Sequence, residues 1–174
     1  MTTPYSPGQM KSPEPGPVAH PVAGSPGRRA AARLIDGLVL VPVALIPSAI
    51  LPATMAGSPS GHLTTAVIAL VNAATFLAYF SLMEACLQQT LGKRFLGLKV
   101  TTDDGHHIGL VPAVTRNIWV AFGVAAIIPL VGSLLGGLAS LAAVVTIAVG
   151  ISSDHLHRRG WHDRLAGGTL VVGV

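Results

Sequence analysis

The sequence predicts an all-α polytopic membrane protein, with four transmembrane helices arranged as two hairpins. Of its 174 residues, 51% are hydrophobic and only 10% are charged, whereas an ordinary soluble domain has about 25% charged residues. Two stretches carry no Asp, Glu, Lys or Arg at all: 47 residues between Asp36 and Glu84, and 37 between Arg116 and Asp154. Because about 20 residues cross a bilayer, each stretch is long enough to cross twice. A soluble globular domain is therefore excluded.

The two turns are predicted by residues that interrupt helices. In the first stretch, Pro52 and the segment 57–61 (GSPSG) place the turn and leave spans at about 31–51 and 63–86. In the second stretch, the segment 129–133 (PLVGS) predicts spans at about 113–130 and 133–152, although Gly136 and Gly137 offer a later turn. One long span followed by a re-entrant or interfacial segment is the alternative for this second stretch.

The basic residues predict the orientation, since Lys and Arg gather in cytoplasmic segments. With four spans, all eleven Lys and Arg residues lie before the first span, between the second and third, or after the fourth. The two turns on the opposite side carry none. We therefore expect a multi-pass protein of the cell membrane whose N- and C-termini are both cytoplasmic. A three-span arrangement places the last three arginines outside and is disfavoured.

Two segments outside the spans have a distinct character. Residues 1–27 hold seven of the 13 prolines, which predicts a disordered cytoplasmic tail before a transmembrane domain over 28–174; we expect no removable signal peptide. Between the second and third spans, short β-branched runs flank an Asp-Gly turn signal, so this inner loop is expected to form a short hairpin or a paired strand. The C-terminal segment 167–174 (GGTLVVGV) has similar β character and is a candidate partner strand for LGLKVTT.

The first span begins with three charged residues on one helix face. Arg29, Arg33 and Asp36 are spaced i, i+4 and i+7, a spacing that allows one ionic ladder near the inner membrane boundary. A pair of Arg33 with Asp36 that only anchors the helix end is the structural alternative. Prolines in the same span each remove a backbone donor, so this helix is expected to be kinked; they are Pro42, Pro47 and Pro52.

Three further polar residues are secondary candidates. Asn72 lies near the middle of the second span, where it either lines a polar path or, as we favour, makes an interhelical hydrogen bond. Glu84 is expected to pair with Gln88 at the inner end of that span. His162 lies in a histidine-rich C-terminal stretch, but the arginines there oppose a dication and no zinc spacing occurs, so no metal is expected.

Other functional classes find no support in the sequence. There is no P-loop, dinucleotide fingerprint or nucleophile elbow, so we expect neither an enzyme nor a cofactor. The surplus of basic residues marks the ends of spans and does not predict nucleic-acid binding. The single cysteine, Cys86, excludes an internal disulfide. The small-residue stripe of Gly132, Gly136 and Ser140 predicts close helix packing.

Three motifs, in this order along the chain, resemble those of the RDD family of prokaryotic membrane proteins, which is named for one arginine and two aspartates. They are RRAAARLIDGLVL, TLGKRFLGLKV followed by DDG, and RRGWHDRLAGGTLVV, with Arg116 where the family often begins its next helix. The resemblance makes Arg29 the family arginine and Asp36 and Asp163 its two aspartates. It implies an integral membrane protein suspected of transport, and some members have been linked to monovalent cation/proton exchange.

These observations support two hypotheses of different class. In the first, the protein is a small transporter or channel-like subunit. Asp36 and Asp163, oriented by Arg29 and Arg116, would then form a protonatable or cation-attracting site at the inner mouth of a homo-oligomer. In the second, it is an accessory or scaffold subunit of a larger membrane complex. Its charges would then hold the hairpins together, and its basic inner face would bind anionic lipid head groups or a partner.

Overall fold

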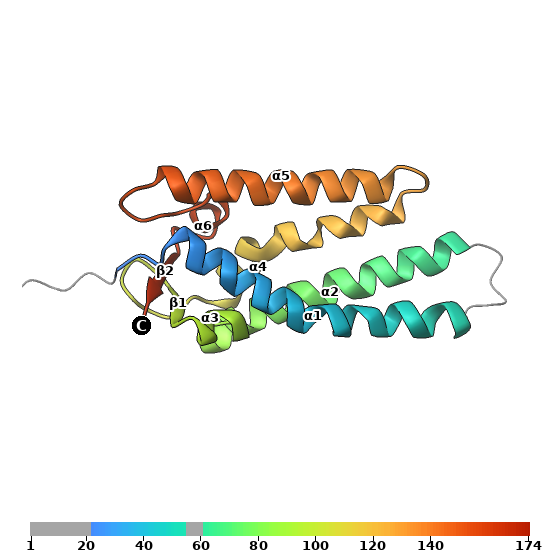
Figure 1. The fold of residues 1–174 in the computed structure, drawn as a ribbon, viewed down its shortest axis with the longest axis horizontal. Helices are drawn as coiled ribbons and strands as arrows, with labels where there is room; N and C mark the ends of the chain where they lie inside the picture. Colours follow the sequence, from blue (N-terminus) through green and yellow to red (C-terminus); the bar gives the residue numbers. More distant parts are fainter. Residues whose placement is uncertain (1–21, 55–60) are drawn as a thin grey trace, which may run out of the picture.

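Four apolar helical segments, each long enough to cross a membrane, make up most of the fold. The computed structural model describes residues 22–54 and 61–174. In Figure 1 the long segments run along the same axis, and the short elements gather at one end. The spans are α1 (Pro26–Thr54), α2 (Gly61–Leu87), α4 (Leu110–Asn117) continued by the 3₁₀ helix η1 (Ile118–Ile127), and α5 (Gly132–Ser153). The short elements are α3 (Leu91–Phe95), β1 (Leu98–Thr101), α6 (Trp161–Leu165) and β2 (Leu170–Gly173).

The first helix is longer than predicted at both ends. It begins at Pro26, a residue favoured in the first helical turn, and the Ser25 hydroxyl accepts a hydrogen bond from the Arg28 N–H at 3.3 Å. Residues 26–27 therefore belong to the helix and not to the predicted tail, whose first 21 residues lie outside the described part. Pro52 also lies inside α1 and not in the turn, because in lipid the backbone gains most from staying helical. The rest of that predicted turn, 57–60, falls outside the described residues.

The predicted kink corresponds to a visible change of direction along α1 (Figure 1). All three prolines, Pro42, Pro47 and Pro52, lie inside the helix. Each lacks the N–H that would bond to the carbonyl one turn earlier. The helix continues through all three positions.

The third span has few residues, but it is long enough in ångströms to cross a membrane. Its 18 residues would rise only about 27 Å as a pure α-helix. With η1 wound as a 3₁₀ helix, they rise about 32 Å, close to the hydrocarbon thickness of about 30 Å. η1 ends at Ile127 and α5 begins at Gly132, which confirms the turn at 129–133 and the division into two spans.

The small residues of α5 allow a close contact with η1, as predicted. A Cβ atom at Gly132 would lie 2.0 Å from the Ala125 carbonyl oxygen, and one at Gly136 would lie 2.8 Å from that of Phe122. Larger side chains would therefore separate the two helices.

The C-terminus is attached to the loop between α2 and α4 by a two-stranded antiparallel sheet. β1 pairs with β2 from Leu98 opposite Gly173 to Thr101 opposite Leu170, which confirms the predicted partner strand. The Asp-Gly segment closes a loop in which the Thr102 N–H donates to the His106 carbonyl at 3.1 Å. A compact core lies beneath the sheet, at the end that also holds all described basic residues; it consists of Ala32, Leu98, Val100, Ile108, Ala113 and Val171.

Candidate functional site

A buried network of charged and polar side chains joins the helices at the basic end of the bundle. Each long span contributes to it or packs against it, and the short helices α3 and α6 supply the remaining groups. Its acidic members are all fully buried. The network consists of Arg29, Arg33 and Asp36 from α1, Glu84 from α2, Lys93 from α3, Arg116 and Asn117 from α4, and Asp163 from α6.

Asp163 lies in the first turn of α6 and binds two arginines from other spans. Its Oδ1 lies 3.1 Å from Arg116 Nη2, and its Oδ2 lies 3.6 Å from Arg29 Nη1. The Gly160 N–H also donates to Oδ2 at 3.1 Å. Burial by itself raises the pKa of Asp163, but the charges of Arg116 and Arg29 and this N–H together hold it below its usual range. Asp163 is therefore a carboxylate that links α6 to α1 and α4.

Arg29 uses its guanidinium to bind the C-terminal segment as well. Nη1 donates to the Arg158 carbonyl at 2.7 Å, and Nη2 donates to the Val171 carbonyl at 3.1 Å. Nε donates to the Gly24 carbonyl at 3.2 Å. Arg29 thus holds the start of α1, α6 and β2 together.

Glu84 forms the second centre of the network. It pairs with Lys93, lies 3.6 Å from Arg116 Nε through Oε2, and accepts a hydrogen bond from Asn117 Nδ2 at 2.9 Å. Burial lowers the pKa of Lys93 to about 8, against the opposing attraction of Glu84. The predicted pairing of Glu84 with Gln88 is wrong: Gln88 donates to the His106 carbonyl at 3.2 Å, because Glu84 is occupied by cations from α3 and α4.

Arg33 does not pair with Asp36, so the predicted ionic ladder is wrong. Arg33 Nη2 donates to Asn117 Oδ1 at 2.7 Å, and the guanidinium lies 3.9 Å from the ring centre of Phe80. Its buried Nη1 has no hydrogen-bond partner within residues 22–54 and 61–174. Three charged residues share one face of α1, but tertiary partners from α2, α4 and α6 replace the expected contacts within the helix.

Asp36 is held by three uncharged donors. Its oxygens accept hydrogen bonds from Thr90 Oγ1 at 2.6 Å, Tyr79 Oη at 2.8 Å and the Gly92 N–H at 2.8 Å. Arg29 and Arg116 contact Asp163 and not Asp36. The two aspartates lie at the same end of the bundle, as predicted, but they belong to separate contacts and do not form a single cation site.

His162 lies beside Asp163 with its Nε2 3.5 Å from Oδ1, and it is 5% exposed. Burial lowers its pKa to about 3, despite the carboxylate, so the imidazole is neutral near pH 7. Within the described part of the chain, no three His, Cys, Asp or Glu side chains are placed to hold a metal ion.

A large cavity adjoins the network. It has a volume of about 1020 Å³ and lies between α1 and α5, with α2 and η1 behind it. Arg33, Lys93, Arg116 and His162 line its basic end, and the rest of its wall is mostly apolar. Asp36 and Glu84 are not among its lining residues.

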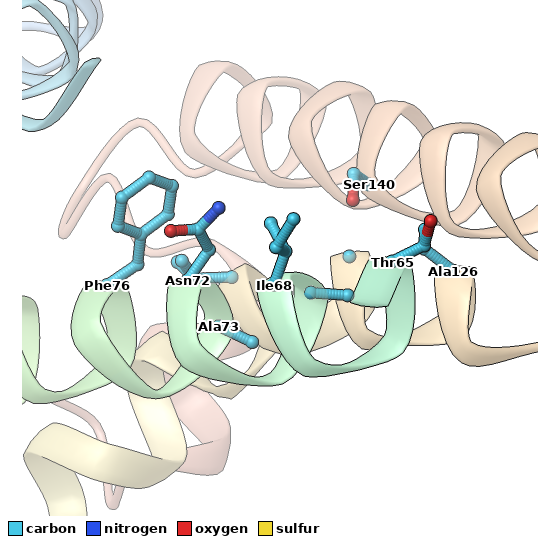
Figure 2. Close-up of a pocket in the computed structure, with 10 residues that line it drawn as sticks. Thr65, Ile68, Asn72, Ala73, Phe76, Ala126 and Ser140 are labelled. Atoms are coloured by element: carbon cyan, nitrogen blue, oxygen red, sulfur yellow. The ribbon is translucent and has the colours of Figure 1, made fainter. Parts of the chain in front are cut away.

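A second cavity, of about 340 Å³, continues from the first toward the other end of the bundle. Figure 2 shows Ile68, Asn72 and Phe76 of α2 pointing across it toward Ser140 of α5. Asn72 makes no side-chain hydrogen bond among the described residues, so the interhelical bond we favoured is not present. The two cavities share four lining residues, Asn72, Phe76, Val120 and Ser140.

Sequence reasoning missed several members of the network. Lys93 lies in the TLGKR motif, and Asn117 directly follows Arg116. Their positions next to recognised motif residues could have identified them as members of the network. Tyr79 and Thr90 bind Asp36, but an uncharged hydroxyl in or beside an apolar span carries no pattern that points to a carboxylate.

The comparisons with known proteins agree with these motifs. The profile of the RDD family matches residues 23–167, a range that contains Arg29, Asp36 and Asp163 with the contacts described above. No curated protein and no solved structure is significantly similar to the chain. The family match covers most of the 174 residues. The chain therefore belongs to the RDD family.

Proposed function

We propose that this RDD family membrane protein transports a negatively charged molecule across the bilayer. The observation that carries the proposal is the pair of adjoining cavities, which meet at Asn72 and Ser140. On α2 their lining extends from Thr65 to Phe80, a rise of about 22 Å out of a hydrocarbon thickness of about 30 Å. A path of this length inside a four-helix bundle suits a transport protein better than a purely structural one.

The charge balance favours an anion over a cation. The network contains four cationic side chains, Arg29, Arg33, Lys93 and Arg116, and three carboxylates, Asp36, Glu84 and Asp163. When all are ionised, one positive charge is in excess, and cations line the cavity while Asp36 and Glu84 do not. An anion at this end would gain electrostatic energy, whereas a monovalent cation would be repelled. The proposal therefore departs from the cation/proton exchange that the family resemblance implies.

The proposal includes an orientation, in which the basic end of the bundle faces the cytoplasm by the positive-inside rule. It also includes a homo-oligomeric assembly that works without a catalytic step. The orientation is testable by membrane-impermeant maleimide labelling in a Cys86→Ser background. Val174→Cys should react only from the cytoplasmic side and Gly61→Cys only from outside. The opposite labelling pattern would reject the orientation.

Transport is testable in vesicles of phosphatidylcholine that contain the purified full-length chain. The probes are radiolabelled inorganic phosphate and a fluorescent head-labelled phosphatidylglycerol, whose transfer between leaflets is followed by quenching. Asn72→Trp fills the junction of the cavities and should slow movement at least tenfold. Val71→Trp is the matched control, because Val71 is the neighbouring residue and is 39% exposed on the outer surface of α2.

Two results would reject the proposal. One is anion movement no faster than in protein-free vesicles. The other is a proton flux that depends on Na⁺ or K⁺, which would favour the exchange activity instead.

A second candidate function is an accessory or scaffold subunit of a larger membrane assembly. It is favoured by the complete burial of Asp36, Glu84 and Asp163, each of which is bound by groups from other elements. Such contacts are sufficient to explain the network without a solute. Light scattering of the chain extracted into native nanodiscs should then give a mass well above that of any small homo-oligomer. A single species containing this chain alone would argue against the scaffold.

A further inference from the structure

The larger cavity combines a cationic end with a long apolar wall. From Arg33, the lining on α1 continues through Leu40 and Ala44 to Ser48, a distance of about 22 Å. This is longer than half of the hydrocarbon core, about 15 Å. A fully hydrophilic anion would lose its hydration along this wall without gaining hydrogen bonds. A molecule with a charged head and a hydrocarbon chain matches both parts of the cavity.

The cationic end holds buried donors without acceptors in the described part of the chain. Arg33 Nη1 and Arg116 Nη1 are both buried and unpartnered, and both residues line the cavity. Arg116 as a whole is only 4% exposed. Buried guanidinium N–H groups without partners are costly, and a phosphate oxygen is a strong acceptor for them.

The wall of the cavity is open to the bilayer on one side. Leu34 and Leu45 of α1 and Val144 of α5 line the cavity, yet they are 71%, 61% and 47% exposed. A chain from the surrounding leaflet can therefore reach the wall laterally, without crossing water.

From these features we infer that the cavity between α1 and α5 binds an anionic phospholipid, with its phosphate at Arg33 and Arg116 and an acyl chain along α1. This inference names the class of molecule that the proposed function transports. It rests on that proposed function only for the role of the lipid. Basic pockets between transmembrane helices on the cytoplasmic side commonly hold lipid phosphates.

The test measures lipid binding directly by native mass spectrometry of the full chain. Dioleoyl phosphatidylglycerol and dioleoyl phosphatidylcholine share their chains and differ in net head-group charge. Wild type should retain phosphatidylglycerol at least tenfold more strongly. Arg33→Gln should reduce this retention about fivefold, the equivalent of about 1 kcal/mol for one basic group near a lipid phosphate. Arg94→Gln is the matched control, because Arg94 is an exposed arginine at the same end.

A second pair of variants tests the acyl-chain part without changing charge. Gly37 lines the cavity, and a Cβ atom there would meet nothing within 4 Å. Gly37→Trp therefore fills the cavity with little strain on the fold and should abolish lipid retention. Gly137→Trp is the control, since Gly137 also has open space around it but lines neither cavity.

Several outcomes would overturn the inference. Equal retention of the two phospholipids would do so, as would retention unchanged by both Arg33→Gln and Gly37→Trp. Oleate binding without phosphatidylglycerol binding would assign the site to a carboxylate, and inorganic phosphate competing at equal concentration would assign it to a free anion. If phosphatidylglycerol is bound selectively but not moved between leaflets, the binding site stands and only the transport proposal fails.

Discussion

Arg116 connects the two acidic centres, so Arg116→Gln tests the network directly. Its Nη2 lies 3.1 Å from Asp163 Oδ1, and its Nε lies 3.6 Å from Glu84 Oε2. At an effective dielectric constant of about 20, each contact gives a gross attraction of about 5 kcal/mol. Burial of the guanidinium offsets much of this gain, so the net cost of removing one partner from a buried pair is about 3–5 kcal/mol. We expect a loss of that size in the free energy of unfolding.

The assay is reversible unfolding in mixed micelles, followed by tryptophan fluorescence. Asp163→Asn and the double variant complete a mutant cycle, in which the coupling should be about 1–3 kcal/mol. Arg164→Gln is the control. Arg164 lies next to Asp163 on α6, and its side chain is 65% exposed and 3.7 Å from its carboxylate partner Asp154. This substitution should change the free energy of unfolding by less than about 0.5 kcal/mol. The reasoning is refuted if Arg116→Gln is equally neutral or if the cycle is additive.

Three further predictions concern other parts of the same end. Since the pKa of His162 is lowered from 6.5 to about 3, the unfolded chain takes up a proton below pH 6.5 that the folded chain does not. The free energy of unfolding should therefore fall by up to about 4 kcal/mol as the pH drops from 6.5 toward 3. When unfolding is measured across this range, His162→Gln should lose much of this pH dependence. Gly92→Ala places a Cβ atom 2.0 Å from the Ala32 carbonyl oxygen, so it should separate α3 from α1 and lower the melting temperature. Gly27→Ala is the control, because a Cβ atom at Gly27 meets nothing within 4 Å. Equal melting temperatures of the two variants would contradict the close contact. Asp36→Asn puts an amide against one of three donors and should cost about 1.5–3 kcal/mol, so a variant that melts like wild type would mean that Asp36 does not hold the end of the bundle.

The helices were predictable because their signal is local. Uncharged stretches of 47 and 37 residues allow few arrangements in lipid, and the breaker at 129–133 divided the second one correctly. The partner strand was also predictable, since two short β-branched segments at the same membrane face need each other to satisfy their edges. The length of α1 was underestimated because Pro52 is a strong breaker in water but a weak one in a bilayer.

The site was predictable only in part of its membership, since Lys93 and Asn117 were missed. Arg29, Arg116, Glu84 and Asp163 all belong to the network, but spacing along one helix suggested the wrong partners for Arg33 and Asp36. Their real partners come from α2, α3 and α4, and such contacts depend on helix rotation, which an apolar span of nearly uniform composition does not encode. The cavity between α1 and α5 was not predictable for the same reason.

The contact of Arg29 with the Val171 carbonyl spans 142 residues of the chain, and this has a consequence for biosynthesis. The ribosome makes Arg29 early, whereas Asp163 and β2 emerge only after the last span has been made. Until then the Gly24 carbonyl can accept from Nε, but the groups that bind Nη1 and Nη2 have not yet been made, so this part of the guanidinium remains hydrated at the membrane surface. A nascent chain that stalls before Asp163 thus leaves Arg29 without its carboxylate partner and without the Val171 carbonyl.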